Sequence, residues 1–215
     1  MRFTIYGERC SGTNYLEELM LNNFNIKVTW DYGWKHFFGF HKFNHDEREN
    51  DTIFIGIVRD PIEWLCSFHN VPHHVPDINK PWANFLCKPF YSINKDKTID
   101  KRDLNFTTNQ IYKSIFELRC CKNYYLINEM PKNVKNYILI NYEDLRDNTE
   151  NMLTRIGNKF NLQLKNDKIE NIIYYKKEKN KQFDKNKKNA CDAKYIEYMK
   201  SSLHKAQEGR LGYIL

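Results

Sequence analysis

The stretch that decides the fold is Phe3-Thr4-Ile5-Tyr6-Gly7-Glu8-Arg9-Cys10-Ser11-Gly12-Thr13-Asn14-Tyr15-Leu16. Its first four residues are β-branched or aromatic, which predicts a short buried strand that ends at Gly7. Apolar residues then recur at helical spacing, at Leu16, Leu19, Met20 and Phe24. The loop between strand and helix collects free backbone N–H groups at the positive end of a helix dipole. Two interpretations follow, a phosphate- or sulfate-binding loop and an ordinary capped turn.

This loop differs from the Walker A loop of ATP- and GTP-binding proteins. The Gly-x-x-x-x-Gly-Lys-Ser/Thr pattern is absent, and no Lys precedes Ser11 or Thr13. A P-loop-type nucleotide kinase is therefore a weaker hypothesis for this chain, although it stays among the alternatives.

Length and composition fit one globular domain that spans residues 1–215. Hydrophobic residues make up 41% of the chain and charged residues 28%. No apolar run is long enough to span a membrane, and the beginning of the sequence lacks the pattern of a signal peptide. We therefore expect a cytoplasmic protein that has no membrane partner.

Charge and cysteine content narrow the classes of partner. The net charge of +7 suits an anionic ligand, but much of the excess lies in Lys176–Lys188, which could equally be a solvated lysine face. No helix-turn-helix, zinc-finger or RNA-binding signature is present, so we expect no nucleic-acid partner. The six cysteines form no C-x-x-C pair, which predicts reduced thiols and neither a disulfide nor a zinc framework.

The order of the predicted elements indicates an α/β fold of three layers, α/β/α, with a central, mostly parallel sheet. Further strands are predicted at residues 26–30, 52–58 and 136–141. The predicted helices cover residues 61–70, the stretch from Ile111 to a stop at Pro131, the region around Met152–Phe160, and residues 196–209. The Pro-rich segment 71–105 is predicted to be irregular and to serve as an acceptor-binding loop or lid.

Three polar sites follow predicted strands and should therefore meet at the carboxyl edge of the sheet. They are the Glu8–Asn14 loop, the Lys35-His36 pair and the Arg59-Asp60-Pro61 corner, in which Asp60 caps the next helix and Pro61 begins it. This convergence favours the anion-binding interpretation of the loop.

The sequence resembles the sulfotransferases that use 3′-phosphoadenosine 5′-phosphosulfate (PAPS). Gly7–Asn14 is similar to their 5′-phosphosulfate loop, and Arg59-Asp60-Pro61 with Ser67 is similar to their 3′-phosphate motif. Tyr142-Glu143-Asp144-Leu145 and Glu208–Tyr213 are similar to two later motifs of the family. The resemblance covers nearly the whole chain, although its central region matches loosely, and it implies a P-loop-NTPase-like α/β/α domain.

The resemblance also implies a set of site residues. PAPS would be held by Glu8, Arg9, Cys10, Ser11, Gly12, Thr13, Asn14, Arg59, Ser67 and Tyr142. His36 would be the base that accepts the proton of a hydroxyl acceptor, which we expect to be a carbohydrate, and Lys35 and Arg9 would stabilise the leaving group. Such an in-line transfer needs no metal. Many members carry Lys or Arg where this chain has Cys10, with Arg9 one residue earlier.

Structural roles remain open for several of these residues. Arg59 could instead pair with Asp60 or Glu63, His36 could belong to an aromatic cluster with Trp34, and Tyr142 could be a core residue. His69 and His73 have the spacing of metal ligands, but Pro72 interrupts a helix between them, so acceptor-loop or surface roles are favoured. Lys185, Lys187 and Lys188 could close over the 3′-phosphate or form an exposed lysine run. Beside the enzyme hypotheses stands a module that binds PAPS or another nucleotide without turnover.

Overall fold

The computed structural model describes residues 1–174 and 191–215. Its sheet has the strands β1 (Arg2–Tyr6), β2 (Lys27–Val28), β3 (Thr52–Val58) and β4 (Tyr137–Asn141) in the order β2-β1-β3-β4. All three pairings are parallel, with Ile5 of β1 opposite Ile55 of β3. The predicted α/β class with a parallel sheet is confirmed.

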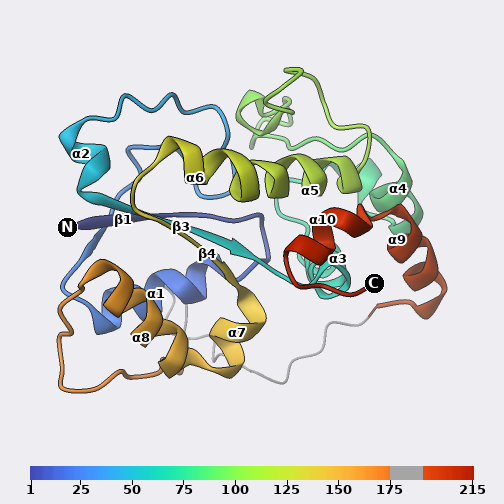
Figure 1. Cartoon of the computed structure of the whole chain (residues 1–215). Coiled ribbons are helices and arrows are strands. Elements are labelled where there is room, and N and C mark those ends of the chain that lie inside the picture. The colour runs from blue at the N-terminus through green and yellow to red at the C-terminus, as the bar shows by residue number, and fades with distance from the viewer. Residues whose placement is uncertain (175–190) are drawn as a thin grey trace.

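The helices connect and cover these strands (Figure 1). They are α1 (Thr13–Asn23), α2 (Glu47–Asn50), α3 (Pro61–Asn70), α4 (Trp82–Cys87), α5 (Ile115–Tyr124), α6 (Met130–Asn133), α7 (Tyr142–Asp147), α8 (Thr149–Phe160), α9 (Ile196–Ser202) and α10 (Lys205–Arg210). Short 3₁₀ turns lie at Asp77–Asn79, Lys101–Asp103 and Ala193–Tyr195, and a π-helical turn at Tyr125–Glu129 joins α5 to α6.

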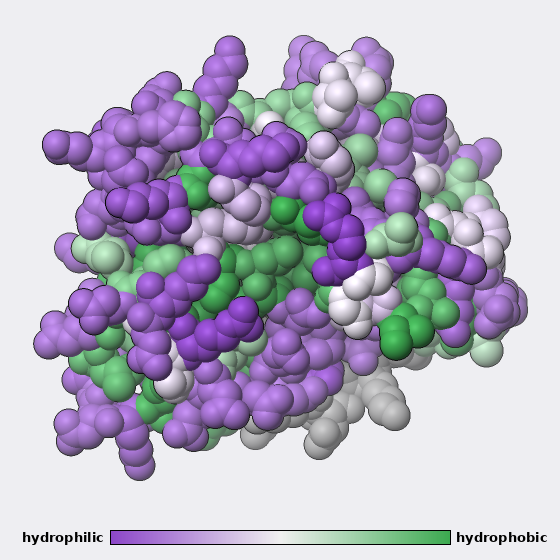
Figure 2. Space-filling view, in the orientation of Figure 1, coloured by the Kyte–Doolittle hydropathy of each residue, from purple (hydrophilic) through white to green (hydrophobic). Residues whose placement is uncertain are grey.

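Alternate residues of the buried strands face two different helical layers, as a strand's period of two requires. Ile55 and Ile57 of β3 pack in a cluster with α1 and α8, whereas Phe54 and Val58 pack with the turn that joins α5 to α6. Figure 1 shows α1 and α8 on one side of the sheet and α5 and α6 on the other. In the same orientation, Figure 2 shows hydrophobic side chains in a band between these layers, at the level of the edge strand β4.

The Pro-rich segment 71–105 packs against the rest of the domain. It contains α4, and its side chains Val75, Phe85 and Phe90 are buried in a third hydrophobic cluster with residues of α3, α5 and α9. Phe90 also exchanges backbone hydrogen bonds with Tyr112. The segment is irregular, as predicted, but much of it is part of the core.

Two predicted helices have different boundaries in the structure. The helix predicted from Ile111 begins at Ile115 because the Ser114 side chain accepts a hydrogen bond from Glu117 N and caps it. Pro131 does not end the helix but lies in the first turn of α6, where its missing N–H costs little after the π-helical turn. The single C-terminal helix predicted at residues 196–209 is divided into α9 and α10.

The prediction of reduced thiols is wrong for two of the six cysteines. Cys66 of α3 and Cys191 form a disulfide across 125 residues, whereas Cys10, Cys87, Cys120 and Cys121 are free. Sequence spacing could not reveal the bond, because chain folding brings these two positions together. Among the described residues, no helix is long and apolar enough to cross a membrane.

Candidate functional site

The loop after β1 is shaped to leave backbone N–H groups free at the start of α1. Ser11 N donates to Glu8 O at 3.1 Å, and Cys10 and Gly12 both have positive φ, at 63° and 86°. Gly12 precedes α1 and provides no side-chain cap for its first turn. A Cβ at Gly12 would collide with the ring of Tyr142, so only glycine fits this position. The loop therefore has the geometry of an anion-binding turn.

The Lys35-His36 pair is hydrogen-bonded to the first residue of this loop. Gly7 N donates to Lys35 O at 3.0 Å, and His36 Nδ1 donates to Gly7 O at 2.8 Å. Lys35 Nζ donates to Asn14 Oδ1 and forms an ion pair of 2.9 Å with Glu17 Oε2. Glu17 of α1 is therefore the partner of the Lys35 ammonium.

His36 has the protonation state that a general base needs. Burial lowers the pKa of His36 to about 3, although the negative charge of Glu8 opposes this shift. The ring is therefore neutral at pH 7. Because Nδ1 donates to the Gly7 carbonyl, the free lone pair lies on Nε2. Trp34 contacts the ring edge-on at 5.9 Å between centroids, so the aromatic neighbour suggested by the sequence is present as well.

The Arg59 side chain lies between the loop and Tyr142. Its Nη1 donates to Cys10 O at 3.1 Å, and its Cζ lies 4.6 Å from the centroid of the Tyr142 ring. Its Nη2 forms an ion pair of 3.1 Å with Glu63, one of the two alternatives offered by the sequence. Arg59 is 8% exposed, and within the described part of the chain its Nε has no hydrogen-bond partner. An anion could satisfy this buried donor.

Cys10 and Ser67 meet beside Arg59. The Ser67 side chain hydrogen-bonds to the Cys10 thiol, and burial raises the pKa of that thiol although Ser67 and Arg59 oppose the shift. The residue that directly precedes Ser11 is therefore a neutral thiol.

Two residues of the later motifs hold the Asp60 turn in place. Glu143 Oε1 accepts from Asp60 N at 2.9 Å, and Tyr213 Oη donates to Glu143 Oε2 at 2.9 Å. The sequence singled out both motifs, but their contact depends on chain folding and has no sequence signal.

A buried ion pair supports the same corner from α5 and α10. Arg119 donates to both carboxylate oxygens of Glu208 at 2.7 Å, and its Nη2 also donates to Arg59 O at 2.9 Å. Sequence reasoning missed Arg119, which lies within an amphipathic helix, where a charged residue usually faces solvent.

The structure places Arg9 in the interior, so it presents almost no surface to a ligand. Arg9 is 2% exposed, and its guanidinium donates to Glu8 at 2.7 Å, Ser92 at 2.6 Å and Asp103 at 2.9 Å. Lys122 completes a cluster with Glu8 and Asp103, at 2.6 and 2.5 Å. We call Glu8, Arg9, Asp103 and Lys122 the ion tetrad. Asp103 and Lys122 were absent from the sequence-based site.

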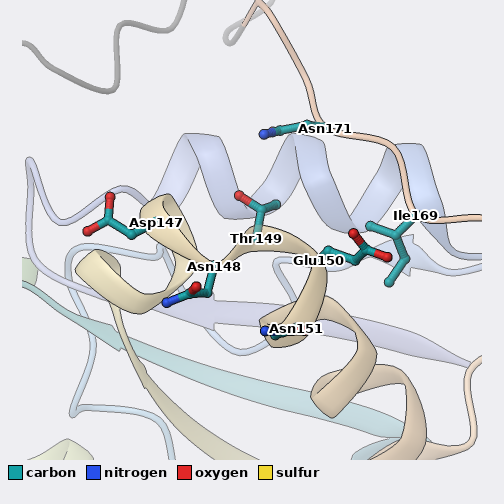
Figure 3. A pocket seen from close by; sticks show the side chains of 7 residues that line it. All are labelled: Asp147, Asn148, Thr149, Glu150, Asn151, Ile169 and Asn171. Carbon is teal, nitrogen blue, oxygen red and sulfur yellow. The ribbon is translucent and has the colours of Figure 1, made fainter.

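A polar cavity of about 350 Å³ opens where α7 meets α8 (Figure 3). Its lining residues come from two segments and are Asp147, Asn148, Thr149, Glu150, Asn151, Ile169 and Asn171. Tyr15 of α1 hydrogen-bonds to two of them, Thr149 at 3.2 Å and Asn171 at 3.0 Å. Because Tyr15 directly follows the loop, its side chain connects the start of α1 to the lining of the cavity.

The remaining candidate residues lie elsewhere. The His69 ring stacks on Trp82 with 3.6 Å between centroids, and burial lowers its pKa. Lys185, Lys187 and Lys188 lie outside the described residues.

Neither protein-family models nor curated protein sequences gave a match to this chain.

Proposed function

We propose that this chain is a sulfotransferase that moves the sulfuryl group of PAPS to a hydroxyl of an acceptor. The proposal rests on one observation: the four segments that follow the four strands come together at the carboxyl edge of the sheet. The loop after β1, Lys35-His36 after β2, Arg59 after β3 and Tyr142 after β4 lie in direct contact. Ligands of open parallel sheets bind at this edge.

The geometry supports separate sites for the two charged ends of PAPS. The uncapped first turn of α1 and the Lys35 ammonium would bind the phosphosulfate. Arg59, with its unpaired Nε, and the hydroxyl of Ser67 would bind the 3′-phosphate. The adenine would lie on the Tyr142 side, toward the cavity bounded by Thr149 and Asn171.

His36 and Lys35 have the chemistry that the transfer needs. His36 Nε2 would take the proton of the acceptor hydroxyl as its oxygen bonds to sulfur, while the bond between sulfur and the bridging phosphate oxygen breaks. The Lys35 ammonium would stabilise the negative charge that develops on the leaving phosphate. The products are a sulfate ester and adenosine 3′,5′-bisphosphate.

A carbohydrate is the acceptor class that the surroundings of His36 favour. Trp34, which contacts the His36 ring, is 44% exposed and pairs with Trp30 at 5.5 Å between ring centroids. An exposed indole face beside the base suits the apolar C–H face of a sugar ring.

One observation favours a second function, a nucleotide-binding module without turnover. Cys10 is a neutral thiol and Arg9 points into the interior, so stabilisation of the leaving group would depend on Lys35, because Arg59 is assigned to the 3′-phosphate. If Lys35 cannot stabilise the leaving group, the chain would bind the nucleotide and transfer nothing.

Two measurements test these alternatives. Calorimetric titration should give a much lower Kd for adenosine 3′,5′-bisphosphate than for AMP or ATP, because Arg59 and Ser67 recognise the 3′-phosphate. Incubation with sulfur-labelled PAPS and a panel of glycans, phenols and alcohols should label a glycan. Binding without labelling would support the module, whereas ATP hydrolysis with Mg²⁺ and equal affinity for AMP would refute both proposals.

A further inference from the structure

The ion tetrad is buried and electrically neutral as a group. Exposed fractions are 8% for Glu8, 2% for Arg9 and Lys122, and 1% for Asp103. Glu8 Oε1 contacts Arg9 and Oε2 contacts Lys122, while the two oxygens of Asp103 divide between the same two cations. Burial would raise the pKa of Glu8, but Arg9 and Lys122 outweigh it and lower this pKa to about 2. Glu8 is therefore ionised within a group of two basic and two acidic side chains.

Stability alone is a weak explanation for four buried charges. Desolvation offsets much of the attraction within a buried ion network, and apolar residues of similar volume often stabilise a protein equally well. What such a network does fix is geometry, because each ion must keep its partners at hydrogen-bond distance.

Lys122 connects the tetrad to the candidate base, His36. Lys122 Nζ of α5 donates to the backbone carbonyl of His36 at 2.6 Å, in addition to its two ion pairs. On the opposite side, the ring of His36 donates to Gly7 O. The histidine is thus held both by the anion-binding loop and by α5.

The tetrad also contacts segment 71–105, to which Asp103 itself belongs. Ser92 donates to Asp103 Oδ2, and Arg9 Nη1 donates to Ser92 Oγ at 2.6 Å and to His73 O at 3.1 Å. Three points of this segment are therefore connected to the residues that hold the histidine.

We propose that Lys122 and Asp103 are positioning residues, which fix the backbone of His36 relative to the anion-binding loop and connect it to segment 71–105. The proposal rests on the proposed function for its catalytic consequence. Its structural content, a defined place and tautomer of His36 that depend on Lys122, stands independently of any reaction.

A neutral double variant separates positioning from charge balance. Lys122→Met alone leaves one uncompensated buried negative charge, whereas Lys122→Met with Asp103→Asn restores neutrality but still lacks the bond to His36 O. The double variant should keep its Kd for adenosine 3′,5′-bisphosphate within about threefold and lose about 10²-fold in kcat, the effect of a small misplacement of a reacting group. A kcat of the double variant within about threefold of the wild-type value would overturn the proposal. Loss of nucleotide binding together with the loss of kcat would overturn it as well.

Nitrogen NMR of the His36 ring gives a readout that does not need activity. The wild type should show one neutral tautomer, with the proton on Nδ1, and the double variant should show exchange between tautomers. In Lys122→Met, the excess negative charge should raise the pKa of His36, which also faces Glu8, Arg9 and Lys35. In the double variant, the pKa of His36 should return toward the wild-type value.

The NMR result also keeps the two proposals distinguishable. If the wild type sulfates no acceptor, the proposed function fails while the tautomer comparison still decides the role of Lys122. An unchanged single tautomer in a folded double variant would refute that role. If Lys122→Met does not fold, the double variant carries the test, and circular dichroism establishes its fold.

Discussion

Replacing Glu63 by Gln should tighten the binding of 3′-phosphorylated adenine nucleotides. Glu63 is the carboxylate that pairs with Arg59, the residue proposed to hold the 3′-phosphate. Its side chain is 47% exposed, whereas that of Arg59 is 9% exposed. The carboxylate can therefore move into water while the guanidinium stays in place, and a phosphate that binds Arg59 has to displace or tolerate it.

The expected magnitude follows from two alternative costs. An exposed ion pair between residues four apart in a helix contributes about 0.3–0.5 kcal/mol, which the wild type loses when the phosphate displaces Glu63. A remaining carboxylate about 4 Å from the phosphate would be repelled by about 1 kcal/mol per phosphate charge in bulk water. Only one of these costs applies to a given bound state, so the gain is about 0.3–1 kcal/mol, or a Kd that is about 2- to 5-fold lower in the variant.

Calorimetric titration with adenosine 3′,5′-bisphosphate and with AMP measures this effect. AMP lacks the 3′-phosphate, so its Kd should change little. Glu47→Gln in α2 is the matched control, because it removes one exposed negative charge from a helix remote from Arg59. At about 1 M salt, where charges are screened within about 3 Å, the advantage of the variant should largely disappear. Equal gains for both ligands, or weaker binding of the bisphosphate, would refute the assignment of Arg59 to the 3′-phosphate.

Three further predictions concern the base, the disulfide and the loop. His36→Ala should lower kcat by about 10²–10⁴-fold and abolish the acidic limb of kcat/KM. In the wild type this limb should lie near pH 3, because His36, with a pKa of about 3, becomes protonated and stops acting as a base as the pH falls. Reduction of Cys66–Cys191 should lower the free energy of unfolding by about 2–5 kcal/mol in urea titrations, with no further loss on reducing the Cys66→Ser, Cys191→Ser variant. Gly12→Ala should weaken nucleotide binding by more than about tenfold, whereas Gly212→Ala, at a similar φ of 88° but with more room, should not.

Much of the sheet edge could be predicted from the sequence because its signals are local. Strand β3 has the predicted bounds, since an apolar β-branched run that ends at Arg59-Asp60-Pro61 encodes both a strand and a helix start. The Asp60 side chain caps α3 by accepting from Ile62 N and Glu63 N, as predicted. The contact between Lys35-His36 and the loop follows from parallel strand order alone.

The parts that could not be predicted depend on contacts between distant segments. Asp103 and Lys122 lie in a 3₁₀ turn and in a helix, where charged residues are ordinarily solvated, and only the folded chain buries them together. Arg9 had the right position in the loop for a phosphate ligand, but these partners draw its side chain inward. The Cys66–Cys191 bond belongs to the same class of long-range contact.

The cations around the site fall into two groups according to the exposure of their carboxylate partners. Arg9 and Lys122 have Asp103 in common, a carboxylate with no exposed side-chain surface. Such pairs are costly to open, because separation leaves a charge uncompensated in the interior.

Lys35 and Arg59, by contrast, pair with Glu17 and Glu63, whose side chains are 19% and 47% exposed. These carboxylates can move into water when an anion arrives, and the cations that they release point to the loop and to the Tyr142 side. Among the described residues, Lys35 and Arg59 are therefore more available to an anionic ligand than Arg9, which is neutralised within the tetrad. Lys35 beside Asn14 and Arg59 beside Cys10 can in this way present two positive groups to an anionic nucleotide.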